Sequence, residues 1–469
     1  MVVPERRAVG ILAAAFALAY STFGLFRHWR FGSSAFDLGI FNQAVWHMSR
    51  LDAPASSISG FSNILGDHFY PVIALFVPLY WMLPRPETLI VAQAALLAAS
   101  LIPVFLFARA RLPYGAALGL TAAYGLYWGM QRAMEFDVHE MAFAPLAIAT
   151  AILALEPPSR FALRWPSRQM LFWIAAASLI FIKEDLIPFL AGAGLLLMLQ
   201  RDYRRGAVLV AGSVAAFVLV VGVVVPSFND AGVYNHASSY GELLAQPWRI
   251  PIALVTPAQK IETALMWFAP FALLSFRSPL VILALPLVLA RLLSASPTHW
   301  GTIFHYTAPL APIVAMIAAD GLGRLRLPQA RLRPLVALIV LLCAILPGGL
   351  PLWRLFRPAH YTLSSSDQDG YALLSMVPPE ASVVAQAAIV PHLSRRDEIY
   401  ILRQGAPDAD YVVASAPLSP WPAASFDELR ILVEQYQRAG YTVVLERNGW
   451  MLLRRDSAPA ANGEPPPSR

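Results

Sequence analysis

The stretch VGILAAAFALAYSTFGLF (9–26) decides the fold class of this 469-residue chain. It carries no charged residue, and a run of this length suits a membrane-spanning helix. Arg6 and Arg7 precede it, and Asp37 follows it. Because arginine-rich ends stay in the cytoplasm, this order predicts a helix that starts inside the cell and leaves Asp37 outside. The stretch lacks a cleavage signature, so we interpret it as a retained first helix rather than a signal peptide.

The composition of the chain is that of an integral membrane protein. Hydrophobic residues make up 57% and charged residues only 14%, whereas a soluble domain carries about a quarter charged residues. The net charge of +6 lies in loops, so we interpret it as a sign of topology and expect no nucleic-acid partner. Cys343 is the single cysteine, which excludes an intrachain disulfide and a cysteine metal site.

The loops between the apolar runs are of two kinds, which alternate along the chain. One kind carries arginine alone, whereas the other gathers acids, histidines and the only two lysines, Lys183 and Lys260. The positive-inside rule places the arginine loops in the cytoplasm, so the other kind shares the outer face. Ionisable groups gathered on one face of a membrane protein predict a reaction or binding site there.

Twelve hydrophobic runs can be counted, and one of them must not cross the membrane if this charge pattern is to hold. The run 69–83 contains Pro71 and Pro78 and is shorter than the roughly 20 residues that a span needs. We expect it to lie in the outer interface, within a long first outer loop at 27–87. About 11 transmembrane helices remain, which form a transmembrane domain at 1–351 with a cytoplasmic N-terminus.

Residues 352–456 have the pattern of a small α/β domain, which this topology places outside the cytoplasm. Ser425 and Glu428 form a capping box that predicts a helix up to Arg438. Asn448-Gly449 predicts a hairpin turn. Strands are expected at 381–389, 398–402, 411–414, 441–445 and 450–454. The tail 457–469 is rich in proline, alanine and serine, and we expect it to be disordered.

Asp37 is the main candidate for a catalytic residue. A helix that starts near Leu38 would make Asp37 its N-cap residue. The same carboxylate could act as a general base at the membrane surface. The sequence does not separate the two roles, because a cap can also be a base.

Two further clusters could supply a second acid or base, or the ligands of a metal ion. Asp67 and His68 form either a turn before the run 69–83 or a pair that binds metal or orients a proton acceptor. The second cluster lies between two spans and consists of Glu135, Asp137, His139 and Glu140. Oxygen-rich groups of this kind suit a divalent cation, Mg²⁺ or Mn²⁺. The spacing of a tight zinc site, HExxH, does not occur in the sequence.

Cations on the outer face are candidates for holding a phosphate, because they run against the positive-inside trend. The candidates are Lys183, Arg132 and Arg291, joined by His305 and Tyr306 at the start of the tenth span. A self-neutralising surface turn is the alternative for Lys183. Snorkelling to lipid headgroups is the alternative for the arginines.

The order of these elements resembles a bacterial membrane family, domain of unknown function 2079. The likeness covers most of residues 10–455. The matching stretches are Phe36-Asp37-Leu38-Gly39-Ile40-Phe41, Asp67-His68-Phe69-Tyr70-Pro71, Asp137-Val138-His139-Glu140, Lys183-Glu184-Asp185 and Pro391-His392-Leu393-Ser394-Arg395-Arg396. The architecture also resembles the GT-C glycosyltransferase superfamily, in which a first span is followed by a long outer loop with an early acid.

This resemblance implies a glycosyltransferase of the inner (plasma) membrane. Its donor would be a polyprenyl-phosphate sugar, and its acceptor a glycan, lipid or protein of the envelope. The loop acid, here Asp37, would be the base or a metal ligand, and direct attack would invert the anomeric carbon. The first loop lacks the Asp-x-Asp pattern of better-known members, which leaves metal dependence open.

Two other functions fit the same composition. A multi-pass transporter would also place ionisable groups in the membrane region, but near its midplane and often within inverted repeats. Here the charges lie at helix ends, and the sequence has no evident repeat. A non-catalytic envelope protein whose outer domain binds a partner is the third reading, and the gathering of acids and cations on one face argues against it.

The topology can be tested with cysteine labelling. A cysteine introduced at Ser364 should react with an impermeant thiol reagent added outside the cell, and one at Ser159 should not, because the arginine loops are cytoplasmic. Labelling at 159 with protection at 364 would invert the topology.

Overall fold

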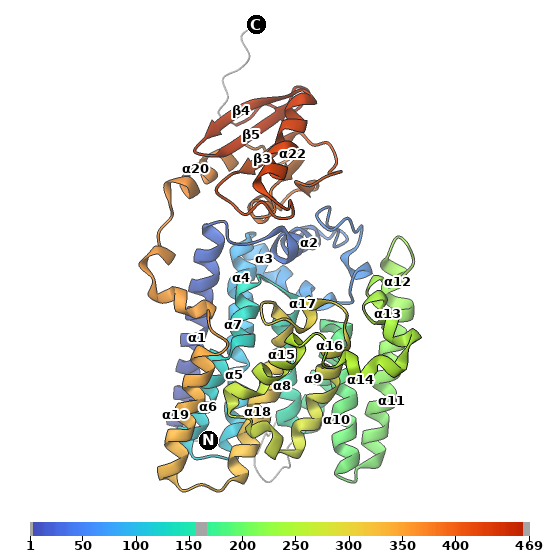
Figure 1. Ribbon diagram of the computed structural model, residues 1–469, viewed down its shortest axis with the longest axis vertical. Helices are drawn as coiled ribbons and strands as arrows, with labels where there is room; N and C mark the ends of the chain where they lie inside the picture. The colour runs from blue at the N-terminus through green and yellow to red at the C-terminus, as the bar shows by residue number, and fades with distance from the viewer. Residues whose placement is uncertain (1–2, 156–166, 463–469) are drawn as a thin grey trace. The chain divides into compact units, whose positions relative to one another are not determined.

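A computed structural model describes residues 3–155 and 167–462 of the chain (Figure 1). The loop that carries Arg160 and Arg164 lies outside the described residues, as does the end of the tail, 463–469. The described chain is mainly helical and includes one five-stranded sheet. It divides into two units. The helical unit consists of Met1–Phe23, Leu65–Ile73 and Val91–Arg354, and the α/β unit consists of Gly24–Ile64, Ala74–Ile90 and Leu355–Arg469.

Three helices among the described residues are long and apolar enough to cross a membrane. They are Pro4–Trp29, Pro86–Arg109 and Tyr203–Phe228. The first is α1 (Val3–Trp29), the second joins α4 (Pro86–Ala99) to α5 (Leu101–Arg109), and the third joins α11 (Tyr203–Leu219), η7 (Val220–Val224) and α12 (Val225–Phe228). The chain is therefore a membrane protein by composition and helix length, while the total of about eleven spans stays a prediction.

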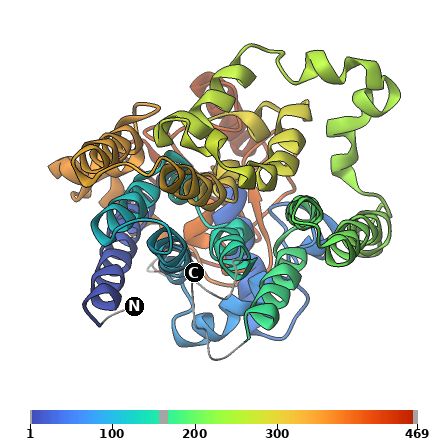
Figure 2. The same cartoon turned by 90° about the horizontal axis from the view of Figure 1, so that it is seen from below.

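The remaining long helices of the helical unit are shorter than the roughly 20 residues of a straight span. They are α6 (Tyr114–Leu126), α8 (Ala144–Leu155), α9 (Arg168–Ile182), α10 (Ile187–Leu199), α15 (Gln259–Phe268), α16 (Leu285–Leu293), α18 (Leu310–Arg324) and α19 (Gln329–Ile345). In both views α10 and α11, drawn in green, run side by side (Figure 1, Figure 2). α18 is almost completely buried and forms the centre of the unit.

The run 69–83 forms two short helical pieces, η3 (Pro71–Phe76) and α3 (Val77–Met82). Val77 and Tyr80 of α3 are buried, whereas Trp81 and Met82 are exposed. The two pieces together are too short for a span, as the sequence predicts. An exposed apolar face on a short helix is typical of a segment that lies in the membrane interface.

The sheet of the α/β unit has the strand order β2-β1-β3-β5-β4. Its strands are β1 (Val383–Ala385), β2 (Ile399–Ile401), β3 (Tyr411–Ser415), β4 (Tyr441–Arg447) and β5 (Trp450–Arg455). β1 pairs in parallel with both β2 and β3, while β5 pairs antiparallel with β3 and β4. Each predicted strand is present, and Asn448 and Gly449 both adopt the positive φ that the predicted hairpin turn requires. The predicted helix is α22 (Phe426–Arg438), capped by Ser425.

The first loop and the C-terminal domain share one core within this unit. Phe31 and Ile58 of the loop are buried in the same cluster as Trp450 and Leu452 of β5. The loop therefore folds with the sheet, although the expected domain boundary at 351 assigns it to the transmembrane part.

Contrary to the disorder expected from residue 457, the described start of the tail packs against the rest of the α/β unit. Two hydrogen bonds hold this start of the tail. The Asn462 amide donates to the Met376 carbonyl at 2.8 Å, and the Tyr411 hydroxyl donates to the Pro459 carbonyl. Ala461 is small enough to enter the core cluster, and it is 4% exposed. The helix α20 (Ser365–Leu374) was not predicted, although Ser364 and Asp367 form a capping box at its start.

Candidate functional site

Asp37 lies in a strained turn directly before the first helix of the loop. The turn is η1 (Ala35–Gly39), and the helix is α2 (Ile40–Ser49). Asp37 has φ +77° and ψ −86°, a conformation that costs a residue with a Cβ atom about 1–3 kcal/mol. The N-cap residue of α2 is Gly39, and no side chain caps the helix. The expected capping role of Asp37 is wrong, because the turn places its backbone ahead of the helix start.

Contacts inside the α/β unit hold this turn in place. A Cβ atom added to Gly39 would lie 3.1 Å from the Val390 side chain, so glycine permits the close approach. The Asn42 amide donates to the Ser394 hydroxyl at 2.8 Å and accepts from the Tyr80 hydroxyl at 3.0 Å. These buried bonds fix α2, and with it the turn that carries Asp37, against α3 and the 391–396 stretch.

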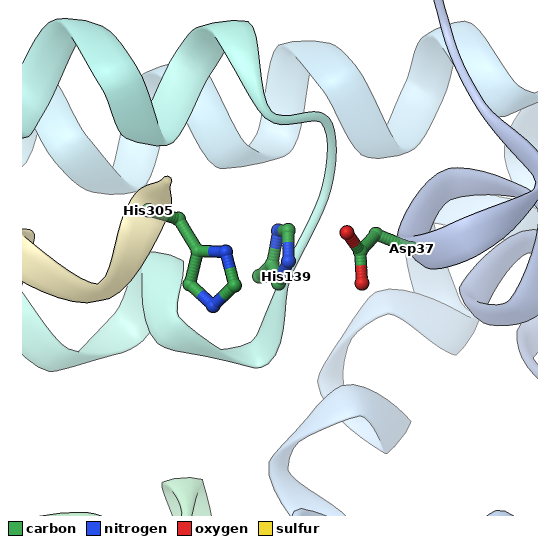
Figure 3. A group of neighbouring side chains, drawn as sticks. All are labelled: Asp37, His139 and His305. Carbon is green, nitrogen blue, oxygen red and sulfur yellow. The ribbon is translucent and has the colours of Figure 1, made fainter. Parts of the chain in front are cut away.

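His139 and His305 form a buried pair in the helical unit. Their ring centroids lie 3.6 Å apart (Figure 3). Among the described residues, neither ring nitrogen of His305 has a hydrogen-bond partner. Gln93 fixes the turn before His139, because it donates to the Asp137 carbonyl at 2.6 Å and accepts from the His139 amide at 3.0 Å. Two rings in contact cannot both be charged at low cost, so the pair offers neutral imidazole nitrogen.

Both Lys183 and Arg132, which the sequence suggests as phosphate ligands, form ion pairs with carboxylates of the chain. Lys183 forms a buried ion pair with Glu140 at 3.0 Å. Burial alone would lower the pKa of Lys183, but the Glu140 carboxylate raises it above its usual value. Arg132 pairs with Glu135, which also accepts from Arg354.

Asp67 and His68 belong to a larger cluster, together with Glu184, Tyr234 and His236. Asp67 lies 2.8 Å from Nε2 of His236, and His68 forms a short contact with Glu184. Glu184 also accepts a hydrogen bond from the Tyr234 hydroxyl at 3.0 Å. The rings of His68 and His236 are stacked, with centroids 3.9 Å apart and planes 13° apart.

The charges in this cluster determine how its members titrate. Burial and Lys183 both lower the pKa of His68, but Glu184 raises it above the usual value. Burial would raise the pKa of Glu184, yet His68 lowers it well below its usual range. Burial likewise opposes ionisation of Asp67, and the hydrogen bond with His236 lowers its pKa. The cluster therefore holds two carboxylates that stay ionised beside a histidine that binds a proton readily.

The donor atoms of this cluster are of the kinds that bind metal ions, but their arrangement does not suit a metal site. Ligand atoms of Asp67, His68 and His236 all lie within 4.8 Å of one another. Imidazole lone pairs lie in the ring plane, and zinc needs them at about 2.0–2.1 Å. Stacked, nearly parallel rings cannot aim both lone pairs at one ion, so each histidine is paired with a carboxylate instead, His68 with Glu184 and His236 with Asp67.

A cavity of about 430 Å³ lies inside the helical unit, between η7, α10, α13 (Ser238–Ala245), α16 and α17 (Pro297–Trp300). Its lining includes the apolar side chains of Phe217, Val221 and Leu287. The polar residues of the lining are Asp185, Tyr234, Tyr240, Arg291, His299 and Tyr306. The cavity thus combines apolar side chains with charged and hydrogen-bonding groups, as a site for an amphiphilic ligand requires.

Arg291 is the main charged group of this cavity. It is 7% exposed, and it makes no ion pair with any residue that the structure describes. Its Nε atom is buried without a hydrogen-bond partner, and its guanidinium lies 5.7 Å from the centre of the Tyr306 ring. The carboxylate of Asp185 belongs to the same cavity lining but forms no ion pair with Arg291. A buried guanidinium without an ion-pair partner is costly.

The groups around Arg291 are neutral hydrogen-bonding groups, apart from Asp185. Burial lowers the pKa of His299 to about 4, and its Nδ1 lies 2.7 Å from the Ser294 hydroxyl. Burial raises the pKa of Tyr240 to about 12, and its hydroxyl donates to the Ala290 carbonyl.

The structure brings together only part of the predicted site. Arg291 and Tyr306 line the cavity, whereas Lys183 and Arg132 are bound to carboxylates. Five further residues of the two groups were not predicted as site residues. Glu184 and His236 belong to the Asp67–His68 cluster, and Tyr234, Tyr240 and His299 line the cavity. Single residues in separate loops carry little signal, because only the fold brings them together.

Two solved structures have a similar fold. Both are of ArnT from Cupriavidus metallidurans, one bound to undecaprenyl phosphate and one in the apo state. Each has a TM-score of 0.55 and covers 94% of this chain and 97% of the other, at 12% and 14% sequence identity respectively. This likeness confirms the expected resemblance to the GT-C fold and, at such identities, concerns the fold alone.

None of the curated proteins matches the chain. A family model does match, and it covers residues 27–452, most of the sequence. The chain therefore belongs to the family described as predicted membrane protein (DUF2079).

Proposed function

We propose that this protein transfers a sugar from a polyprenyl-phosphate donor to an acceptor in the cell envelope, and that the cavity around Arg291 holds the phosphate of the donor. The observation that carries the proposal is a buried guanidinium with no ion-pair partner in a cavity that both apolar and polar side chains line. A polyprenyl phosphate fits such a cavity, because its isoprenoid chain can pack against the apolar side chains and its phosphate can bind Arg291.

Arg291 would act on the phosphate in two ways. A guanidinium binds phosphate oxygens through paired, charge-assisted hydrogen bonds, which repay the cost of its burial. The same contact stabilises the charge that develops on the phosphate as the sugar leaves. Asp185 lines the same cavity and repels a phosphate, so the sugar hydroxyls are the better partners for it.

Asp37 would be the general base. Its carboxylate accepts the proton of the acceptor hydroxyl while the acceptor oxygen bonds to the anomeric carbon and the bond from that carbon to the phosphate oxygen breaks. The electron pair of the broken bond leaves on the phosphate, and displacement in one step inverts the anomeric carbon. The strain stored in the Asp37 backbone supports a functional role, because strained residues persist at sites where the surrounding structure fixes them.

The remaining assignments follow the topology. The acceptor would be a glycan, lipid or protein outside the cytoplasm, and the protein would lie in the inner membrane with its α/β domain on the outer side. The Asp67–His236 and His68–Glu184 pairs would serve as a second acid or base.

Replacing Asp37 by Asn should lower sugar transfer by about 100- to 10,000-fold, the contribution of a general base. Asn has the same shape and tolerates positive φ, so the melting temperature should stay within a few degrees. The assay measures release of undecaprenyl phosphate from lipid-linked sugars extracted with the native membrane. Asp52→Asn, an exposed acid in the same loop, is the matched control. Full activity of Asp37→Asn removes Asp37 from the mechanism.

Replacing Arg291 by Gln should weaken binding of undecaprenyl phosphate at least about tenfold, because the phosphate loses its charged partner. Arg291→Lys should retain part of the affinity, and binding of uncharged undecaprenol should not change. Native mass spectrometry of the purified protein measures all three. Arg249→Gln removes an exposed arginine and serves as the control. Equal affinity of wild type and Arg291→Gln for the phosphate would refute the proposed site.

The His68–Glu184 pair predicts a pH-dependent stability. The pKa of His68 is raised above 6.5, so its stabilisation is fully present below that value and is lost as pH rises through the folded pKa. The pKa of Glu184 is lowered from 4.5, so its stabilisation is lost only as pH falls below that value. The difference in melting temperature between wild type and His68→Gln should therefore be largest at about pH 5–6.5 and shrink toward about pH 9. A constant difference over that range contradicts the pairing.

A further inference from the structure

The second lysine of the chain, Lys260, is buried without an acidic partner. It lies at the start of α15 and is 4% exposed. Its ammonium donates to three backbone carbonyls, those of Ala253 at 2.8 Å, Leu292 at 2.6 Å and Ser294 at 3.3 Å. It forms no ion pair with a residue in the described part of the chain. Burial lowers its pKa. The three carbonyl dipoles stabilise the buried ammonium, together with the Trp300 ring, whose centre lies 5.6 Å from Nζ.

Two of these carbonyls lie at the end of α16. The last carbonyls of a helix have no partner within the helix, and they carry the negative end of its dipole. An ammonium is a suitable cap for such an end. Arg291 belongs to the last turn of the same helix. Lys260 therefore fixes the helix end from which Arg291 enters the cavity.

The turn after α16 carries a second group of the cavity. The Ser294 hydroxyl is bonded to Nδ1 of His299 at 2.7 Å and accepts from the Ser296 amide at 3.1 Å. The Ala295 amide donates to the Ser239 carbonyl at 3.0 Å, which ties the turn to α13. Because Lys260 binds the Ser294 carbonyl, one ammonium holds the backbone between Arg291 and His299.

We propose that Lys260 is a positioning residue for the phosphate site, which acts through the end of α16 on Arg291 and through Ser294 on His299. It does not line the cavity and would touch no ligand. This inference rests on the proposed function, because it assumes that Arg291 binds the phosphate of the donor. A lysine suits the position, because a compact ammonium can donate to three carbonyls at once.

The inference predicts a selective loss of affinity. Lys260→Met should weaken binding of undecaprenyl phosphate about tenfold, because Arg291 loses its fixed position. Binding of undecaprenol should stay unchanged, since the apolar side chains that line the cavity are not altered. Lys260→Arg should restore part of the affinity for the phosphate, because it keeps a cation that donates to carbonyls.

A double-mutant cycle separates positioning from a general structural role. In an Arg291→Gln background, Lys260→Met should cause no further loss of phosphate affinity, because the group that it positions is gone. If Lys260→Met does not accumulate, a second cycle combines Ser294→Ala with His299→Gln. The Ser294→Ala change removes the hydroxyl that holds His299, so it should cause no further loss once His299 is replaced.

The outcomes distinguish the two claims. If Arg291→Gln weakens phosphate binding and Lys260→Met does not, the positioning role is wrong. Equal losses for undecaprenol and its phosphate, or fully additive losses in the cycle, also overturn it. If Arg291→Gln binds the phosphate like the wild type, the proposed function fails first.

Discussion

The helical unit is organised by the need to give each buried charge a partner. Lys183 is bound to Glu140, and His68 is bound to Glu184. Lys260 has no acid within reach and is satisfied by backbone carbonyls instead. Arg291 is the exception, because it is buried beside a cavity and forms no ion pair with a carboxylate of the described chain, although Asp185 lines the same cavity. Since a buried charge without an ion-pair partner is destabilising, we propose this position as the place where a ligand supplies an anion.

A second constraint concerns the loop that follows the first helix. The Asp37 turn is strained, so it depends on surrounding contacts to persist. Asn42 and Gln43 of α2 supply them, because both hydrogen-bond to the 391–396 stretch. Phe31 adds apolar contact with the sheet. The C-terminal α/β domain therefore has a definite role within its own unit, which is to hold the loop that carries the candidate base.

Local patterns were enough to predict much of the α/β unit. The Asn448-Gly449 turn and the Ser425 cap are determined by neighbouring residues, and both are present as predicted. The short run 69–83 also follows from its prolines and length. The capping role of Asp37 failed because the helix starts at Ile40, after a tight approach of Gly39 to Val390 that no local pattern contains.

The candidate site was less predictable, because it too depends on contacts between residues far apart in the sequence. The sequence identifies Arg291 as a cation on the unexpected side of the membrane, but it cannot say that its neighbours are Tyr240 and His299. It also proposes Arg132 and Lys183 as candidates for holding a phosphate, although the fold gives each a carboxylate partner. Pairing of charges depends on long-range contacts, so composition and spacing reveal which charges exist and not which of them are satisfied.

Photo-cross-linking of a polyprenyl phosphate tests the central claim most directly. The probe would be an undecaprenyl phosphate with a photoreactive group in the isoprene unit nearest the phosphate, and the cross-linked peptides would be mapped by mass spectrometry. The account predicts cross-links to the cavity wall at Phe217, Val221 and Leu287 that excess unlabelled undecaprenyl phosphate removes. Cross-links confined to a different cavity, which α6 and α19 line at Gly119 and Val336, would contradict it.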